Sequence, residues 1–288
     1  MPSPDAYTRF STAAELLAHL PPRRSVAVDG QAVTYRATGE PSGAGRPVVF
    51  LHGLLGSADS WALQLVGLAG RHRVVAWDAP GYGGSAGAEP DLDAFADRLR
   101  GFLAALALDR PLVVGHSMGG AVAARVAADG DAAGVDRLVL SCTHPGYAAP
   151  PGTPPTAKLQ DRIRTLKDQG AEAYGRGRAA AMVAQPAAPL ALDLAARVAA
   201  GTRVDGLFAA TRMLQFADLR PLYGRIAAPT RVLFGERDPV VAPGLSAELR
   251  DLTPFAEHVI LPGVGHAPYL EDPAGYAAAL APFLEAPF

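Results

Sequence analysis

Short apolar runs alternate with helical patterns along most of this chain, and this alternation constrains the fold more than any other feature. The runs consist mainly of Val, Leu, Phe and Ala, and Gly, Pro or charged residues bound them. Continuous apolar runs of this kind are typical of parallel strands that helices cover on both faces. We therefore expect buried strands at residues 48–51, 74–77, 112–114, 138–140, 231–234 and 258–261.

The segments between these runs have helical periodicity. In residues 92–106, for example, Leu92, Phe95, Leu99 and Phe102 recur at a spacing that places them on one face of a helix. A chain in which strands and helices alternate in this way is predicted to be α/β, with a mostly parallel central sheet flanked by helices. The expected helices are 62–68, 92–106, 118–128, 242–252 and 273–284.

A hairpin precedes the alternating region. Residues 25–28 and 31–35 flank Asp29-Gly30, a pair that tolerates the positive φ of a tight two-residue turn. We expect two antiparallel strands here.

The alternation stops between residues 143 and 226. Pro and Gly are frequent from Pro145 to Pro155, and only helical patterns follow. A structureless loop of this length is not expected inside a compact domain. We therefore predict a core domain formed by residues 1–142 and 227–288, with residues 143–226 inserted between two core strands as a helical cap. The expected cap helices are 158–169, 171–183, 190–200 and 207–216.

Composition and charge exclude several classes of protein. The formal net charge of −2 predicts no nucleic-acid or anionic-membrane partner, and the hydrophobic content of 49% excludes a disordered chain. Cys142 is the single cysteine, so no intramolecular disulfide can form. No apolar run is long enough to cross a membrane, and charged residues interrupt the N-terminus where a signal peptide would be apolar. We expect a cytoplasmic protein that is a monomer or a homodimer.

The motif Gly115-His116-Ser117-Met118-Gly119 lies directly between an expected strand and an expected helix. This G-x-S-x-G pattern forms a sharp turn that exposes the serine hydroxyl at the edge of a sheet, near the positive end of the following helix. The strained turn requires small residues at its flanks. A Gly-rich turn around a merely buried serine is the alternative, and the flanking strand and helix weigh against it. Ser117 is thus the candidate nucleophile.

Asp238 and His266 are the candidate partners of Ser117. A serine hydroxyl needs a general base to take its proton, and that base needs an acid to orient it. Both residues directly follow expected strands, in the chain order Ser, Asp, His. We favour Asp238 as the acid because Pro239 closes the turn at that point. The rival acids are Glu236, Glu271 and Asp272.

The tetrahedral oxyanion of such a reaction needs two backbone N–H donors. We expect one from Met118, directly after the nucleophile, and the other from Leu54, because Gly53 permits close approach of the backbone. His52 has no second ligand at a metal-binding spacing, so no metal is expected. The glycines of residues 78–85 lack the pattern of a dinucleotide loop, and we expect no cofactor. His116 and His144 are interpreted as packing or surface residues.

Together these segments resemble the α/β-hydrolase-fold serine hydrolases. The resemblance implies a Ser117–His266–Asp238 triad, an oxyanion hole formed by the Leu54 and Met118 amides, and a cap formed by the insertion. Serine at the turn argues against the epoxide hydrolases and haloalkane dehalogenases, which use a carboxylate nucleophile. The closest likeness is to the 3-oxoadipate enol-lactonase-like and carboxylesterase branch. The motifs that carry the resemblance are Leu51-His52-Gly53, residues 78–83, residues 115–119, residues 235–238 and Gly265-His266.

The expected activity is that of an esterase or lactonase that cleaves a small carboxylic ester or lactone through an acyl-enzyme on Ser117. Two alternatives stay open: a C–C bond hydrolase of ring-cleavage products with the same triad, and a ligand-binding protein on a hydrolase scaffold. Arginines of the cap could bind a dicarboxylate, but Lys158 and Lys167 are the only lysines of the chain, so arginines are expected there in any case. The candidate pocket-lining residues are Trp61, Tyr147, Met182, Met213 and Phe216.

Overall fold

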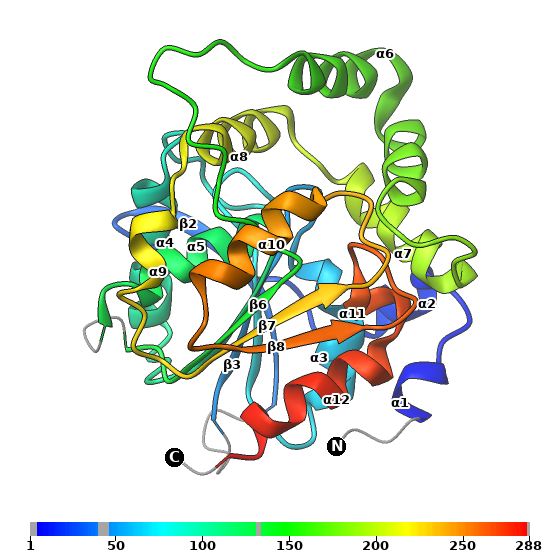
Figure 1. Cartoon of the computed structure of the whole chain (residues 1–288). Coiled ribbons are helices and arrows are strands. Elements are labelled where there is room, and N and C mark those ends of the chain that lie inside the picture. The colour runs from blue at the N-terminus through cyan, green and yellow to red at the C-terminus, as the bar shows by residue number, and fades with distance from the viewer. Residues whose placement is uncertain (1–4, 40–45, 131–133, 287–288) are drawn as a thin grey trace.

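An eight-stranded sheet forms the centre of the computed structural model, which describes residues 5–39, 46–130 and 134–286 (Figure 1). The strands are β1 (Arg24–Val28), β2 (Gln31–Thr38), β3 (Val48–Leu51), β4 (Val74–Trp77), β5 (Leu112–His116), β6 (Arg137–Ser141), β7 (Thr230–Gly235) and β8 (Glu257–Leu261). Their order in the sheet is β1-β2-β4-β3-β5-β6-β7-β8. β2 pairs antiparallel with β1 and β4, and all other neighbours are parallel. The expected mostly parallel α/β fold is confirmed.

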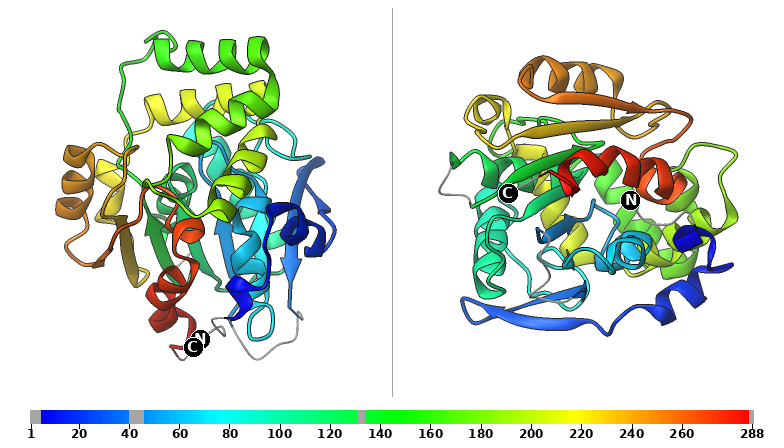
Figure 2. Two further views of the ribbon diagram at one scale, coloured as in Figure 1. Left: turned by 90° about the vertical axis from the view of Figure 1, so that its right-hand side faces the viewer. Right: turned by 90° about the horizontal axis from the view of Figure 1, so that it is seen from below.

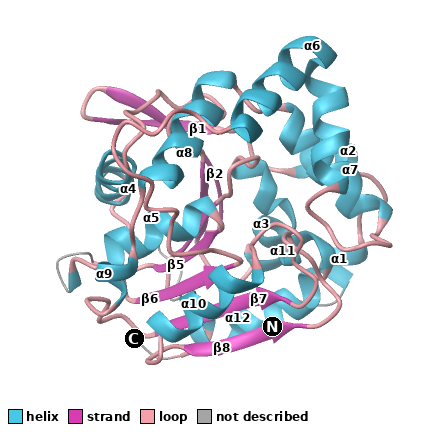
Figure 3. Ribbon diagram, turned by 45° about the horizontal axis from the view of Figure 1, so that its top comes forward, coloured by secondary structure: helices cyan, strands magenta, loops and turns pink. Residues whose placement is uncertain are grey.

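Alternate residues of the central strands face two separate hydrophobic cores. Val49 and Leu51 of β3 belong to one core, and Val48 and Phe50 belong to the other. α4 (Leu92–Ala105), α5 (Met118–Ala127) and α10 (Pro243–Leu252) cover the first core, whereas α3 (Ala62–Leu68) and α12 (Pro273–Leu284) cover the second. Figure 3 shows the strands running between these helices. Burial on both faces explains why the central strands are apolar without interruption.

Four helices lie between β6 and β7 in the chain: α6 (Ala157–Ala180), α7 (Pro189–Ala200), α8 (Val204–Phe216) and α9 (Arg220–Tyr223). Figures 1 and 2 show α6, α7 and α8, here called the cap helices, beyond one end of the sheet. Gly170 has φ 80° and ψ 167°, which breaks α6 into two parts where the sequence predicted two helices. The division into a core of 1–142 and 227–288 and a cap of 143–226 remains our proposal, and this placement supports it.

One strand differs from its expected environment. β8 was expected to be buried on both faces, but it forms the edge of the sheet, and the Ile260 side chain is 54% exposed. An apolar run therefore does not distinguish an edge strand from a central one.

Several short elements were not expected from the sequence: α1 (Asp5–Thr8), α2 (Ala13–His19), α9, α11 (Pro268–Glu271) and a 3-10 turn at Ala58–Trp61. One signal for α2 was available, because Thr12 and Glu15 form a capping box at its start. No helix within the described ranges is both long and apolar enough to cross a membrane.

Candidate active site

Ser117 occupies the sharp turn between β5 and α5. Its φ of 52° and ψ of −114° are a strained conformation for a residue other than glycine. A Cβ atom on Gly115 would lie 2.5 Å from the Gly119 carbonyl oxygen, and one on Gly119 would lie 2.4 Å from that of Leu51. The turn therefore has room only for glycine at both flanks. The Thr143 hydroxyl stabilises the turn by donating a hydrogen bond to the Ser117 carbonyl oxygen at 2.6 Å.

Asp238 and His266 lie in the loops that follow β7 and β8. The His266 Nδ1 atom is 2.9 Å from Asp238 Oδ2, while Asp238 Oδ1 accepts hydrogen bonds from the Val240 and Val241 N–H groups at 2.7 and 3.1 Å. Burial by itself would raise the pKa of the Asp238 carboxyl, but the His266 contact and the two N–H donors lower it below its usual value. An ionised Asp238 keeps a proton on Nδ1 of His266 and leaves Nε2 free to act as a base.

Ser117 and His266 line the same cavity, which has a volume of about 510 Å³. Leu54 also lines it, and a Cβ atom on the preceding residue, Gly53, would lie 3.2 Å from the Ser117 Cβ. Met118 begins α5, so its N–H has no carbonyl partner within the helix. The residues singled out as nucleophile, base and oxyanion donors thus meet at the carboxyl ends of the parallel strands, with Asp238 behind His266.

His52 fixes the peptide group that carries the Leu54 N–H. The Gly53 carbonyl oxygen lies 2.8 Å from His52 Nδ1 and accepts a hydrogen bond from the Gly56 N–H at 2.9 Å. Because the Ala79 N–H donates to His52 Nε2 at 3.0 Å, the ring carries its proton on Nδ1 and donates it to Gly53. In a trans peptide the N–H points away from the C=O, so these bonds also aim the Leu54 N–H. This role of His52 was not expected from the sequence.

His116, the last residue of β5, contacts the backbone of His266. Its Nε2–H donates to the His266 carbonyl at 2.7 Å, and burial together with the nearby His266 lowers the pKa of His116 to about 3. His116 is therefore a neutral, buried residue, in line with the packing role expected for it.

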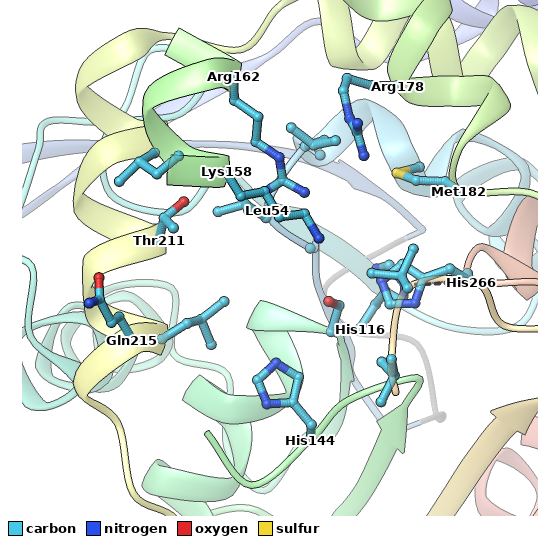
Figure 4. Close-up of a pocket in the computed structure, with 18 of the residues that line it drawn as sticks. Leu54, His116, His144, Lys158, Arg162, Arg178, Met182, Thr211, Gln215 and His266 are labelled. Carbon is cyan, nitrogen blue, oxygen red and sulfur yellow. Dashed lines mark hydrogen bonds between the residues drawn. The ribbon is translucent and has the colours of Figure 1, made fainter. Parts of the chain in front are cut away.

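His144 reaches the cavity itself (Figure 4). Its Nδ1 accepts a hydrogen bond from the Gly146 N–H at 3.1 Å, which leaves the proton on Nε2. Burial and the nearby His266 lower the pKa of His144 to about 4, so the ring is neutral near pH 7. His144 can thus offer an N–H donor to a bound molecule, a role that the sequence analysis missed.

The three rival acids have other partners. Glu236 accepts a hydrogen bond from the Gly263 N–H at 2.7 Å, and Asp272 accepts one from the Gly275 N–H at the start of α12. Glu271 accepts from the N–H groups of Gly265 and Ala267, at 2.8 and 3.0 Å, and from that of Ala184 at 2.7 Å. Of the four carboxylates, Asp238 is the one that contacts the His266 ring.

One group of metal-type ligand atoms occurs among the described residues: those of Cys142, Asp238 and His266, which lie within 4.8 Å of one another. These atoms suit a metal poorly. Burial raises the pKa of the Cys142 thiol, so it stays protonated, and the Asp238 and His266 atoms already share a hydrogen bond.

The expected pocket lining was right in part. Tyr147 and Met182 line the cavity. Trp61 instead packs between Phe50 and Tyr269 in the core, with ring centroids 4.6 and 4.4 Å away. The prediction was also wrong for Met213, which is buried in the other core, and for Phe216, whose ring lies under Arg212. These positions were candidates because their side chains are large and apolar, and such side chains form the core as readily as a pocket wall.

Comparisons with known proteins bear on the family and the fold of this chain. The model of the alpha/beta hydrolase family matches residues 48–279. The pimeloyl-acyl carrier protein methyl ester esterase of Chromobacterium violaceum is 32% identical over 251 residues, which cover 85% of this chain and 97% of that protein. The AB hydrolase superfamily protein YisY of Bacillus subtilis is 30% identical over 250 residues, covering 81% and 89%. The crystal structure of the enol-lactonase from Burkholderia xenovorans shares the fold, with a TM-score of 0.78 at 24% identity over 91% of this chain and 100% of that chain.

Proposed function

Because this chain belongs to the alpha/beta hydrolase family, we propose that it is a serine hydrolase that cleaves a small carboxylic ester or lactone through an acyl-enzyme on Ser117. The observation that carries the proposal is the 2.9 Å contact between Asp238 and His266, in a site where His266 and Ser117 line one cavity. The name of the Chromobacterium violaceum relative, an ester esterase, favours the same bond type.

The first half of the reaction forms the acyl-enzyme. The His266 Nε2 atom takes the proton of the Ser117 hydroxyl while the oxygen attacks the ester carbonyl carbon. The carbonyl oxygen becomes an oxyanion that accepts hydrogen bonds from the Leu54 and Met118 N–H groups. His266 then gives its proton to the alcohol oxygen, the C–O bond breaks, and the acyl group stays on Ser117. Asp238 stabilises the imidazolium throughout.

The second half releases the acid. His266 takes a proton from water, whose oxygen attacks the acyl carbon, and a second oxyanion forms at the same N–H groups. The bond to Ser117 breaks as His266 returns the proton to the serine oxygen. In a lactone the leaving alcohol remains attached to the acyl group, so a single hydroxy acid is the product.

The test is hydrolysis of p-nitrophenyl acetate and butyrate by the wild type and by Ser117→Ala. We expect kcat to fall by roughly 1,000-fold or more, because the residual rate comes from the oxyanion hole and binding alone. Ser246→Ala, on α10 away from the cavity, is the matched control and should keep the wild-type rate. A fluorophosphonate should add to the wild type at Ser117 and leave Ser117→Ala unmodified, as measured by intact mass.

Full activity in Ser117→Ala would overturn the proposal. Labelling of Ser117 without turnover of any ester or lactone would also contradict it and would favour a ligand-binding protein.

A further inference from the structure

The cavity has three cationic side chains on its cap side. Lys158 and Arg162 lie one helical turn apart on the first part of α6, Arg178 lies on the second part, and all three line the cavity. Figure 4 shows their charged ends pointing from the cap into the space above His116 and His266. The break at Gly170 turns α6 so that its two parts present their charges to the same space.

Unlike Arg164 and Arg176 of the same helix, these three side chains have no acidic partner among the described residues. Arg164 pairs with Asp161, and Arg176 lies 3.8 Å from Glu172. By contrast, the Nε atoms of Arg162 and Arg178 are buried and have no hydrogen-bond partner within the described ranges. An abundance of arginine in the chain explains why arginines occur in the cap, but it does not explain why these lack a counter-charge.

The positive charges of this cluster repel one another. Burial and the neighbouring positive charges lower the pKa of Lys158 and of Arg162. The Arg162 and Arg178 side chains are half-buried and Lys158 is exposed, so the free-energy cost of an unpaired charge away from water falls mainly on the two arginines. A bound anion would remove both the repulsion and the missing hydrogen bonds.

The three cationic residues are placed to contact one end of a bound molecule, away from the bond that reacts at Ser117. The same three residues also line a second hollow, on the α6 side of the cavity, so they lie where the two spaces meet. Between them and Ser117 the wall is largely apolar and includes Leu54, Leu159, Met182 and Val198. A molecule that fills this space would have a charged end, an apolar middle and a reactive end.

We propose that the substrate carries an anionic group, a carboxylate or a phosphate monoester, which Lys158, Arg162 and Arg178 bind while the scissile ester lies at Ser117. This inference rests on the proposed function and specifies its substrate class. Carboxylate and phosphate oxygens match the N–H fork of arginine, and two arginines with a lysine suit either group. The anion can belong to the acyl part or to the alcohol part of the ester, and the experiment separates these two sources.

The experiment compares esters that differ only in charge. In one arm, p-nitrophenyl monoesters of glutaric, adipic and suberic acids are compared with their methyl p-nitrophenyl diesters. In the other arm, the butyrate ester of glycerol 3-phosphate is compared with that of glycerol. We expect kcat/KM for the anionic ester to exceed that for its neutral partner by about 10-fold or more in one arm, as charge-assisted hydrogen bonds to the anion predict.

The variants Arg162→Gln and Arg178→Gln should each reduce that anionic-to-neutral ratio several-fold. Arg164→Gln and Arg176→Gln are the matched controls, because these arginines lie on the same helix, are paired and do not line the cavity. Both controls should keep the wild-type ratio. Because each ratio is taken within one variant, a general loss of folded protein does not change it.

A wild-type ratio near one in both arms would overturn the inference, as would a ratio that Arg162→Gln and Arg178→Gln leave unchanged. Binding is measured separately, from the thermal unfolding of Ser117→Ala with each uncleaved ester. The anionic ester should raise Tm more than its neutral partner, and adding Arg162→Gln should remove this difference. Stabilisation of this kind without turnover by the wild type would support the anion site and contradict the hydrolase proposal, so the two failures are distinguishable.

Discussion

Glu271 holds His266 in place without touching its ring. Its carboxylate accepts hydrogen bonds from the N–H groups of Gly265 and Ala267, the residues on either side of His266. It also accepts one from Ala184, and the His266 N–H donates to the Met182 carbonyl at 2.9 Å. The loop that carries the candidate base is therefore fastened to the segment between α6 and α7. We infer that Glu271 is a positioning residue.

Glu271→Gln tests this role. Replacing one carboxylate oxygen by an NH₂ group places a donor opposite a backbone N–H, so the loop should shift and kcat should fall by about 10-fold or more. KM should change little, because Glu271 does not line the cavity. Steady-state kinetics on a p-nitrophenyl ester separates the two constants. Glu236→Gln, which affects a single backbone contact in the same loop, is the control and should stay near the wild type. A wild-type kcat in Glu271→Gln would contradict the role.

Asp238→Asn should abolish most of the activity while the fold is kept. An amide at this position favours the wrong tautomer of His266, and the expected loss of kcat is roughly 10,000-fold. Asp272→Asn is the control, because asparagine caps a helix as well as aspartate does and the start of α12 should be preserved. Equal kcat values for the two variants would show that Asp238 is not the acid that orients His266.

Gly119→Ala should prevent correct folding of the turn at Ser117. Its Cβ atom would lie 2.4 Å from the backbone oxygen of Leu51, and neither backbone can move without disturbing the central strands. We expect insoluble protein or a free energy of unfolding lowered by several kcal/mol, on the scale of overpacked cores. Gly244→Ala in α10 is the control, since nothing lies within 4 Å of its added Cβ, and a gain of about 0.5–1 kcal/mol is expected there. Urea unfolding measures both. A soluble Gly119→Ala of wild-type stability would contradict the steric argument.

The stability of the protein should fall as the pH is lowered from about 6.5 toward 4. His116 and His144 have pKa values of about 3 and about 4 in the folded protein, whereas an unfolded histidine titrates near 6.5. In this window the unfolded chain binds more protons than the folded one, so protonation favours unfolding. Urea unfolding at pH 7.5, 6.5, 5.5 and 4.5 measures the slope.

His116→Asn should lower stability at pH 7.5 but reduce the loss between pH 6.5 and 4.5, because one of the buried histidines is gone. His19→Gln, at an exposed position, should keep the wild-type slope. If the free energy of unfolding of His116→Asn depended on pH as strongly as that of the wild type, this prediction would be wrong.

Residues whose position follows from local pattern could be found from the sequence. Ser117, Asp238 and His266 each lie within five residues of the end of a strand, and parallel strands bring such positions to one edge of a sheet. The break in α6 at Gly170 also falls between two helices expected from the sequence, 158–169 and 171–183.

Residues whose partners are distant in the chain could not be found in this way. His52 bonds to Ala79, His116 bonds to a carbonyl 150 residues later, and Glu271 bonds to Ala184. A histidine or glutamate in a loop has the same local pattern whether it supports a catalytic loop or faces solvent. The unpaired state of Arg162 and Arg178 is equally invisible, because only the fold decides which arginines meet a carboxylate.

The fastening of the His266 loop to Met182 and Ala184 limits how this protein can be engineered. All three proposed anion-binding residues lie within α6, so replacing residues 157–180 by another sequence could change the preferred substrate while leaving the reaction intact. A chimera that also exchanged residues 182–184 would have to keep the same backbone path, because the Met182 carbonyl and the Ala184 N–H hold the loop that carries His266. The simplest graft therefore ends at Ala181, before the segment whose backbone holds this loop.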